Sequence, residues 1–209
     1  MQQESTARAS GGGQAGVSRR VLARGAAWAV PAVTIAAAAP ALAASPPPPG
    51  LQGWLGVGKT CVSGTDTLTI DGRGSFPTRG LWVYYTTSTT VLTGARMTFY
   101  YPTSLGTLTW SDSINGWSKP VVTTGVDPVM PGYTAYTTYY TGGWTWVNAT
   151  GTDPDYTLAN GDPYFTASVT LSDAVCRAGG LTMYIQRTVT VTDGGDSETI
   201  SFLRGPTIM

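Results

Sequence analysis

The amino-acid sequence predicts an all-β protein. Its composition favours strands, because Thr, Tyr, Val and Trp are abundant while the good surface helix formers Glu, Lys and Gln are scarce. Charged residues make up 11% of the chain, against about a quarter in ordinary globular domains. Short runs of alternating apolar and polar residues also recur along the chain, separated by Gly, Pro, Asn and Asp.

The first segment of the chain is predicted to be an export signal. An arginine pair precedes a charge-free apolar run from Ala26 to Ala39, and Ala41 and Ala43 supply the small residues that a signal peptidase reads. The apolar run is shorter than the roughly 20 residues that span a bilayer. We therefore expect cleavage after Ala43, with a retained membrane anchor as the alternative.

The arginine pair lies in a longer motif, which consists of Ser18, Arg19, Arg20, Leu22 and Arg24. This motif resembles the twin-arginine translocation signal, S-R-R-x-F-L-K, with Leu in the Phe place and Arg in the Lys place. The GAAWAVPAV segment that follows resembles signals common on secreted and surface proteins of actinomycetes. The resemblance implies export in the folded state to the cell surface or the medium, and it implies nothing about what the exported domain does.

The exported part has the size of one domain and a small negative charge. Beyond Ala43 the chain has eight basic and eleven acidic residues, a formal charge of −3. Such a balance gives no electrostatic footprint for nucleic acid or for anionic lipid. We expect neither nucleic acid nor membrane as a partner once the signal is removed.

Two cysteines, Cys61 and Cys176, lie near the two ends of the exported part. In an oxidising compartment, an even count favours a disulfide, and only one intramolecular pairing exists. The bridge would tie the first strand to a late one. Two unpaired buried thiols are the alternative.

Several strands are predicted from alternation and turn residues. The first group comprises Thr67–Ile70, Leu81–Thr87, Met97–Tyr101, Thr107–Trp110 and Val121–Thr124. Tyr133–Val147 is expected to form a hairpin around Thr141-Gly142-Gly143, and Gly151–Asp162 is expected to be a loop because it is rich in Asp, Pro, Asn and Gly.

The clearest alternation lies in the last third of the chain. Phe165, Ala167, Val169 and Leu171 form one predicted inward-facing set, and Leu181, Met183, Ile185, Val189 and Val191 form another. Arg187 interrupts the second set, so we expect a bend or an exposed strand edge there. A final strand through Ile200 and Phe202 follows the Asp193–Asp196 turn.

About nine or ten short strands without an amphipathic helix predict a two-sheet antiparallel β-sandwich of immunoglobulin-like type, with a jelly roll as the alternative. The predicted organisation is a signal peptide over 1–43, a Pro-rich spacer over 44–53 and a sandwich domain over 54–209.

The sequence contains no histidine, which excludes Ser-His-Asp and Cys-His catalysis as well as histidine metal sites. Paired carboxylates could still hydrolyse glycosides, but Glu198 is the one glutamate of the exported part and its aspartates mostly lie in turn sequences. We therefore predict no catalytic residue, no cofactor and no enzyme. A glycan-acting hydrolase is the least favoured alternative.

Two sets of side chains remain as candidate binding sites. Asp153, Asp155 and Asp162 offer oxygen ligands in one loop, a weak calcium candidate that turn formation explains equally well. Tyr136, Tyr140, Trp144 and Trp146 could form an aromatic face on the expected hairpin, where sugar rings would stack. Core packing is the competing explanation for these aromatics.

The favoured function is a non-enzymatic surface or extracellular module that contacts a cell-wall polymer or another surface protein. Self-association is a further expectation, because Thr-rich strands with few charges can pack against like copies.

Overall fold

The computed structural model describes residues 47–62 and 65–209. The predicted export signal, with Ser18, Arg19, Arg20, Leu22, Arg24, Ala41 and Ala43, lies outside the described residues. Among those that are described, no helix is both long enough and apolar enough to cross a membrane.

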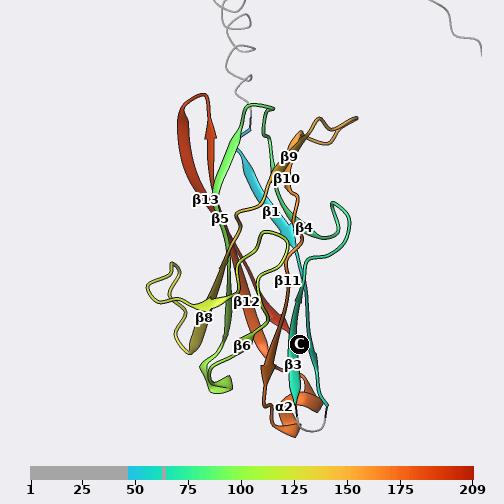
Figure 1. Cartoon of the computed structure of the whole chain (residues 1–209), viewed down its shortest axis with the longest axis vertical. Helices are drawn as coiled ribbons and strands as arrows, with labels where there is room; N and C mark the ends of the chain where they lie inside the picture. The colour runs from blue at the N-terminus through green and yellow to red at the C-terminus, as the bar shows by residue number, and fades with distance from the viewer. Residues whose placement is uncertain (1–46, 63–64) are drawn as a thin grey trace, which may run out of the picture. The chain divides into compact units, whose positions relative to one another are not determined.

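The described residues form thirteen strands, one short α-helix and one 3-10 turn (Figure 1). In chain order these are β1 (Gly50–Trp54), β2 (Gly56–Thr60), β3 (Asp66–Asp71), β4 (Gly80–Tyr84), β5 (Val91–Pro102), η1 (Thr103–Leu105), β6 (Thr109–Trp110), β7 (Val121–Val122), β8 (Tyr133–Tyr139), β9 (Trp144–Val147), β10 (Tyr156–Ala159), β11 (Tyr164–Val169), α2 (Asp173–Ala178), β12 (Thr182–Asp193) and β13 (Asp196–Ile208). The first strand lies almost wholly inside the predicted spacer, so the folded domain begins earlier than expected.

The strands form three hydrogen-bonded sheets. Sheet A has the order β1-β4-β10-β9, sheet B has the order β2-β3-β11-β6, and sheet C has the order β13-β12-β5-β8-β7. Strand β1 leads directly into β2, and β3 and β10 continue into β4 and β11 after short breaks. Sheets A and B are therefore two halves of one layer, and a backbone bond from Gly72 N to Pro163 O (2.7 Å) joins them.

Sheet C packs against that interrupted layer, and the core lies between them. Phe99 of β5 contacts Phe165 of β11 across the layers, with ring centroids 6.2 Å apart, and it also contacts Trp110 of β6 at 5.8 Å. All paired strands are antiparallel. The predicted all-β sandwich is confirmed.

The strand order is that of an immunoglobulin-type Greek key. In one layer, β1 and β2 together correspond to strand A of that fold, and β3 and β4 to strand B. The pair β10 and β11 corresponds to strand E and β9 to strand D, which gives the order A-B-E-D. The last, next-to-last and third strands (β13, β12, β5) form the other layer as G-F-C, with β8 added beside β5. This order favours the immunoglobulin-like architecture over the jelly roll.

Alternation predicted the two C-terminal inward-facing sets correctly. Every member of both sets is buried, and Met183, Val189, Phe165 and Ala167 have no exposed surface. The prediction for Arg187 is wrong. Instead of lying at a bend or an exposed edge, Arg187 is 1% exposed in the sandwich interior, paired between Met97 of β5 and Phe202 of β13.

The predicted hairpin over Tyr133–Val147 is wrong. Strand β8 pairs with β5 and β7 in sheet C, whereas β9 pairs with β10 in sheet A. The Gly-containing segment between them carries the chain from one layer to the other. Alternation had indicated which side chains share a face of each strand, but it cannot indicate which sheet a strand joins.

The expected loop over Gly151–Asp162 contains β10, whose Thr157 and Ala159 are buried while Tyr156 and Leu158 are half-buried. The helix α2 was not predicted either. Ser172 caps it by accepting a hydrogen bond from Val175 N (3.3 Å).

This helix carries one partner of the predicted disulfide, which is confirmed. Cys61 follows β2 and is bonded to Cys176 of α2, at a sequence separation of 115. Next to it, the Lys59 ammonium donates to the carbonyls of Val175 (2.7 Å) and Met209 (2.8 Å). The bridge and this lysine together fasten α2 and the end of β13 to β2. A disulfide of this kind indicates an oxidising, extracytoplasmic environment.

Candidate functional site

The predicted aromatic face does not exist as a surface. Tyr136 and Tyr140 are only 1% and 6% exposed. The hydroxyl of Tyr136 accepts from Leu108 N (2.9 Å), and that of Tyr140 donates to Gly143 O (2.7 Å). These rings are part of the core, because Tyr136 of β8 packs on Trp110 of sheet B and Tyr140, just after β8, packs on Trp144 of sheet A.

The two tryptophans of β9 also serve packing. Trp144 lies edge-on to Tyr140, with centroids 5.4 Å apart, and is half-buried against the core. Trp146 donates its indole N–H to Thr86 O (3.1 Å). Neither of them shares a sheet with Tyr136, so the four predicted glycan-binding residues do not form one platform.

A different aromatic cluster lies on the outer side of sheet A. We define the outer aromatic cluster as Phe76, Trp82, Tyr84, Tyr85 and Tyr156. Phe76 stacks on Tyr156 at 4.0 Å and lies edge-on to Trp82 at 5.1 Å. Tyr84 contacts Tyr156 at 6.2 Å and Tyr85 at 6.4 Å. Tyr85 is 45% exposed, so part of the cluster is open to a ligand.

The calcium candidate is not assembled. Strand β10 separates Asp155 from Asp162, and the Asp155 carboxylate accepts a hydrogen bond from Ala149 N (3.0 Å), as a turn residue would. Within residues 47–62 and 65–209, the one group of three metal-type ligands is Cys61, Asp66 and Cys176. Its two sulfurs are bonded to each other, and Asp66 accepts from Leu171 N (2.7 Å).

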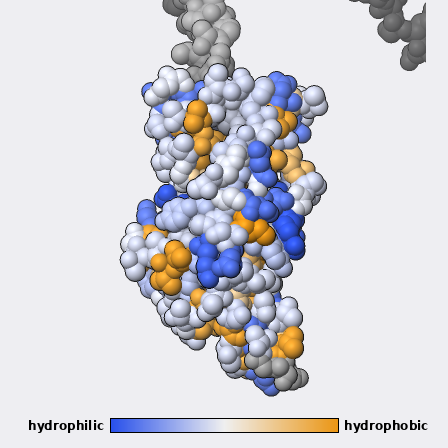
Figure 2. Space-filling view, viewed as in Figure 1, coloured by the Kyte–Doolittle hydropathy of each residue, from blue (hydrophilic) through white to orange (hydrophobic). Residues whose placement is uncertain are grey.

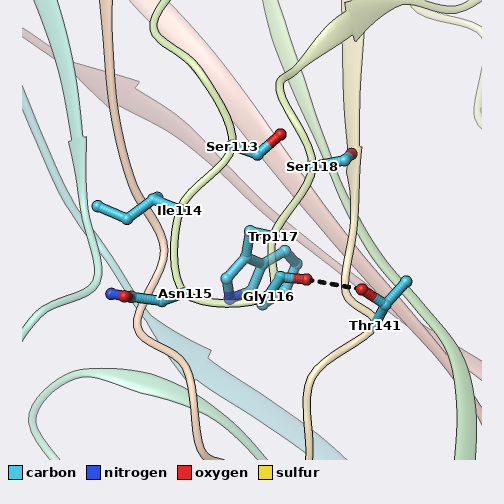
Figure 3. A pocket seen from close by; sticks show the side chains of 7 residues that line it. All are labelled: Ser113, Ile114, Asn115, Gly116, Trp117, Ser118 and Thr141. Atoms are coloured by element: carbon cyan, nitrogen blue, oxygen red, sulfur yellow. Dashed lines mark hydrogen bonds between the residues drawn. The ribbon is translucent and has the colours of Figure 1, made fainter.

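A hollow of about 320 Å³ lies beside the tight turn at Asn115 and Gly116 (Figure 3). Both residues have positive φ angles, 51° and 81°, as a two-residue turn requires. Trp117 beneath the turn is buried and donates to Gly161 O (2.8 Å), and Thr141 closes the turn with a hydrogen bond to Gly116 O (3.3 Å). The lining side chains hold the turn in place, and no acid or base stands among them.

The most regular surface feature is a set of hydroxyls on the outer face of sheet C. We define the hydroxyl ladder as Thr188, Thr190 and Thr192 of β12 together with Ser197, Thr199 and Ser201 of β13. Cross-strand hydrogen bonds join them in pairs at 2.9 Å (Thr188 to Ser201), 2.8 Å (Thr190 to Thr199) and 3.0 Å (Thr192 to Ser197). All three members on β13 are exposed, while Thr188 is buried.

The ladder carries no charge. Apart from Arg187, strand β12 presents apolar residues to the core at every second position, and its outward positions carry the hydroxyls. Glu198 has the opposite parity from the ladder, and Asp193 and Asp196 lie at the turn that joins the strands. The six residues themselves form an uncharged strip with donors and acceptors at regular spacing, and Arg96 of β5 lies opposite Thr188 on the same face.

Apolar side chains do not gather into one large patch on the face seen in Figure 2, where small separate orange areas lie among pale and blue, hydrophilic areas. The exposed apolar side chains include Val91 of β5, the adjacent Val121 and Val122 of β7, and Val129 of the loop before β8. A broad hydrophobic contact of the kind that marks obligate interfaces is thus not presented on that face.

A comparison with protein-family models, with curated proteins and with solved structures finds no match to the chain.

Sequence reasoning identified the Thr-rich alternation of β12, but it missed the pairing that builds the ladder. It also missed the outer aromatic cluster, because Phe76 comes from a Gly- and Pro-containing loop and Tyr156 from a strand taken for a loop. The signal that could have found the cluster is the alternation of Trp82 and Tyr84 against Leu81 and Val83.

Proposed function

We propose that this chain is an exported, non-enzymatic β-sandwich module that contacts a cell-wall polymer or a surface protein through the hydroxyl ladder of sheet C. The observation that carries the proposal is the ladder itself, an uncharged strip of paired hydroxyls on a regular sheet. Each hydroxyl pair uses one of its two protons in the cross-strand bond, which leaves one donor and several lone pairs for a ligand.

Compartment and composition support the same function. The disulfide requires an oxidising environment, and the twin-arginine-like motif would deliver the folded domain there. A neutral, hydroxylated polysaccharide offers the complementary donors and acceptors and no charge that would have to be desolvated.

Co-sedimentation with insoluble cell wall and polysaccharides tests this function. The informative variant is the double substitution Thr190→Val and Thr199→Val, which keeps side-chain shape and strand preference but removes one hydroxyl pair. Thr109→Val on β6, an exposed strand residue of sheet B, is the matched control. We expect the wild type and the control to sediment with the polymer and the double variant to remain in solution. Equal sedimentation of all three proteins would show that the ladder is not the contact surface.

The outer aromatic cluster favours a second candidate function, binding of a soluble oligosaccharide on sheet A. Aromatic faces stack against sugar rings, and the indole N–H of Trp82 beneath Phe76 has no hydrogen-bond partner among the described residues. Titration followed by tryptophan fluorescence would test it with Tyr85→Ala and, as control, Tyr139→Ala, since Tyr139 is equally exposed at 45% but lies in sheet C. Loss of the signal with both variants, or with neither, would exclude a site at the cluster.

A further inference from the structure

Strand β13 is a long edge strand with little to prevent further pairing. It spans Asp196–Ile208, pairs with β12 on one side, and ends the order of sheet C (Figure 1). Between Ser197 and Leu203 it has no proline and one charged residue, Glu198. Natural proteins usually shorten, charge or cover such an edge, because its free backbone groups bind other strands.

The free backbone groups can be assigned from the hairpin. The two-residue turn at Gly194 and Gly195, with φ angles of 58° and 97°, makes Asp193 and Asp196 a hydrogen-bonded pair. Pairs alternate along an antiparallel ladder, so the even-numbered residues of β13 bond to β12. The N–H and C=O groups of Ser197, Thr199, Ser201 and Leu203 then point away from the sheet. Outside the β12–β13 ladder, none of these groups takes part in a backbone hydrogen bond within the described part of the chain.

Two charges on the same face of β13 have no ion-pair partner among the described residues. Arg204 lies 3.7 Å above the Trp54 ring, and its Nη1 is buried without a hydrogen-bond partner. Glu198 is exposed. Neither of them forms an ion pair with any residue in 47–62 or 65–209. Six residues of extended strand separate the two by about 20 Å, so they cannot meet within one molecule.

We propose that β13 pairs antiparallel with β13 of a second copy about a twofold axis at Ser201, which joins the two sheets C into one continuous sheet. In this register Glu198 lies opposite Arg204 of the second copy, and the reverse pair forms by symmetry. Thr199 faces Leu203 of the second copy, and Ser201 faces itself. Three residue pairs exchange about six backbone hydrogen bonds.

The side chains select this register. Ile200 lies opposite Phe202 of the second copy, and both are partly buried against the core. An axis moved to Ile200 would instead place the Glu198 carboxylate opposite the Phe202 ring and would separate it from direct contact with Arg204. Apolar and opposite-charge pairs stabilise a sheet, whereas a carboxylate opposite an apolar ring gains nothing. This pairing is independent of the hydroxyl ladder, because it occupies the free edge of β13 and not the outer face of sheet C.

Charge exchange tests the proposal. Sedimentation velocity of the purified protein over a concentration series should show a monomer–dimer equilibrium. Glu198→Arg, at an exposed position, should weaken it roughly tenfold or more, because it places like charges opposite each other. Arg204→Glu should do the same, and the double variant should restore dimerisation. A monomer at all concentrations, or a dimer that Glu198→Arg leaves unchanged, would overturn the proposal.

Cysteine cross-linking tests the register independently of the charges. Opposite residues of a hydrogen-bonded pair have Cα atoms about 5.5 Å apart, a distance that a disulfide spans. Ser201→Cys should therefore form a covalent dimer on a non-reducing gel, while Val129→Cys, at a side chain 76% exposed in the loop before β8, should not. Equal cross-linking of the two variants would overturn the pairing, and stronger cross-linking through Thr199→Cys would overturn the register. If Glu198→Arg abolishes the dimer but leaves sedimentation with the polymer unchanged, the pairing of β13 is supported whether or not the hydroxyl ladder binds a polymer.

Discussion

Replacing Arg187 by methionine should make the protein more stable. Arg187 is buried between the layers, and its Nε and Nη1 atoms have no hydrogen-bond partner within the described residues. It also forms no ion pair there. Gly53 leaves room for it, since a Cβ on that residue would come within 2.9 Å of Nε. An unpaired buried cation is costly, and an apolar side chain of similar length removes the cost.

The magnitude follows from the two unsatisfied groups. Each buried donor without a partner costs about 1 to 2 kcal/mol, so Arg187→Met should raise the free energy of unfolding by about 2 to 4 kcal/mol. For a domain of this size that corresponds to a rise in Tm of roughly 4 to 16 °C.

Chemical denaturation with urea, monitored by tryptophan fluorescence, measures the difference directly. Val189→Ala, a neighbouring core substitution on the same strand, is the control and should destabilise, because it leaves a cavity. A loss of stability in Arg187→Met would refute the reasoning, because it would mean that the guanidinium has a partner that stabilises the fold.

The pH dependence provides a second view of the same group. Burial, followed by repulsion from Arg204, lowers the pKa of Arg187 to about 10. A base whose pKa is lower in the folded state destabilises the fold while it is charged, and this penalty disappears as the pH rises above the folded pKa. The stability difference between Arg187→Met and the wild type should therefore shrink above pH 10.

Three further predictions concern other parts of the fold. Removing the disulfide with Cys61→Ala and Cys176→Ala should lower the free energy of unfolding by up to about 5 kcal/mol, measured by denaturation, because the bridge closes a loop of 115 residues. Tyr101→Phe should leave stability unchanged or raise it by about 1 kcal/mol in the same assay, since its hydroxyl is buried without a partner among the described residues and burial raises its pKa; a clear loss would reveal a partner. Arg73 donates to the Asp71 carboxylate (2.9 Å) and lowers the pKa of Asp71, so Arg73→Ala should return that pKa towards its usual range in an NMR titration. In the wild type, the pair stabilises the fold at pH values above the usual pKa of Asp71. This contribution disappears as the pH falls through the lowered pKa.

Local alternation was sufficient to predict much of this fold. The strand through Phe165 and the strand through Val189 were predicted with the correct faces, because one side of each packs on the core and the other does not. The disulfide could be predicted because two cysteines allow one pairing only. These features depend on properties that the sequence carries residue by residue.

Features that depend on tertiary placement could not be predicted in this way. The chain crosses between layers after Tyr140, yet its Thr-Gly-Gly sequence is equally suited to a hairpin turn. Arg187 is tolerated in the interior because Gly53 of a distant strand leaves space for it, and nothing near Arg187 in the sequence indicates that space. The outer aromatic cluster likewise joins residues from three separate segments.

The most direct measurement is hydrogen–deuterium exchange of the backbone amides, with and without insoluble cell wall and over a range of protein concentration. The proposed contacts predict that protection increases at Ser197, Thr199 and Ser201 of β13, where the amides point away from the sheet in the isolated chain. Added wall polymer should protect them through the ladder, and higher concentration should protect them through pairing with a second copy. Unchanged exchange at these three amides under both conditions, or new protection confined to sheets A and B, would contradict the assignment of β12 and β13 as the contact surface.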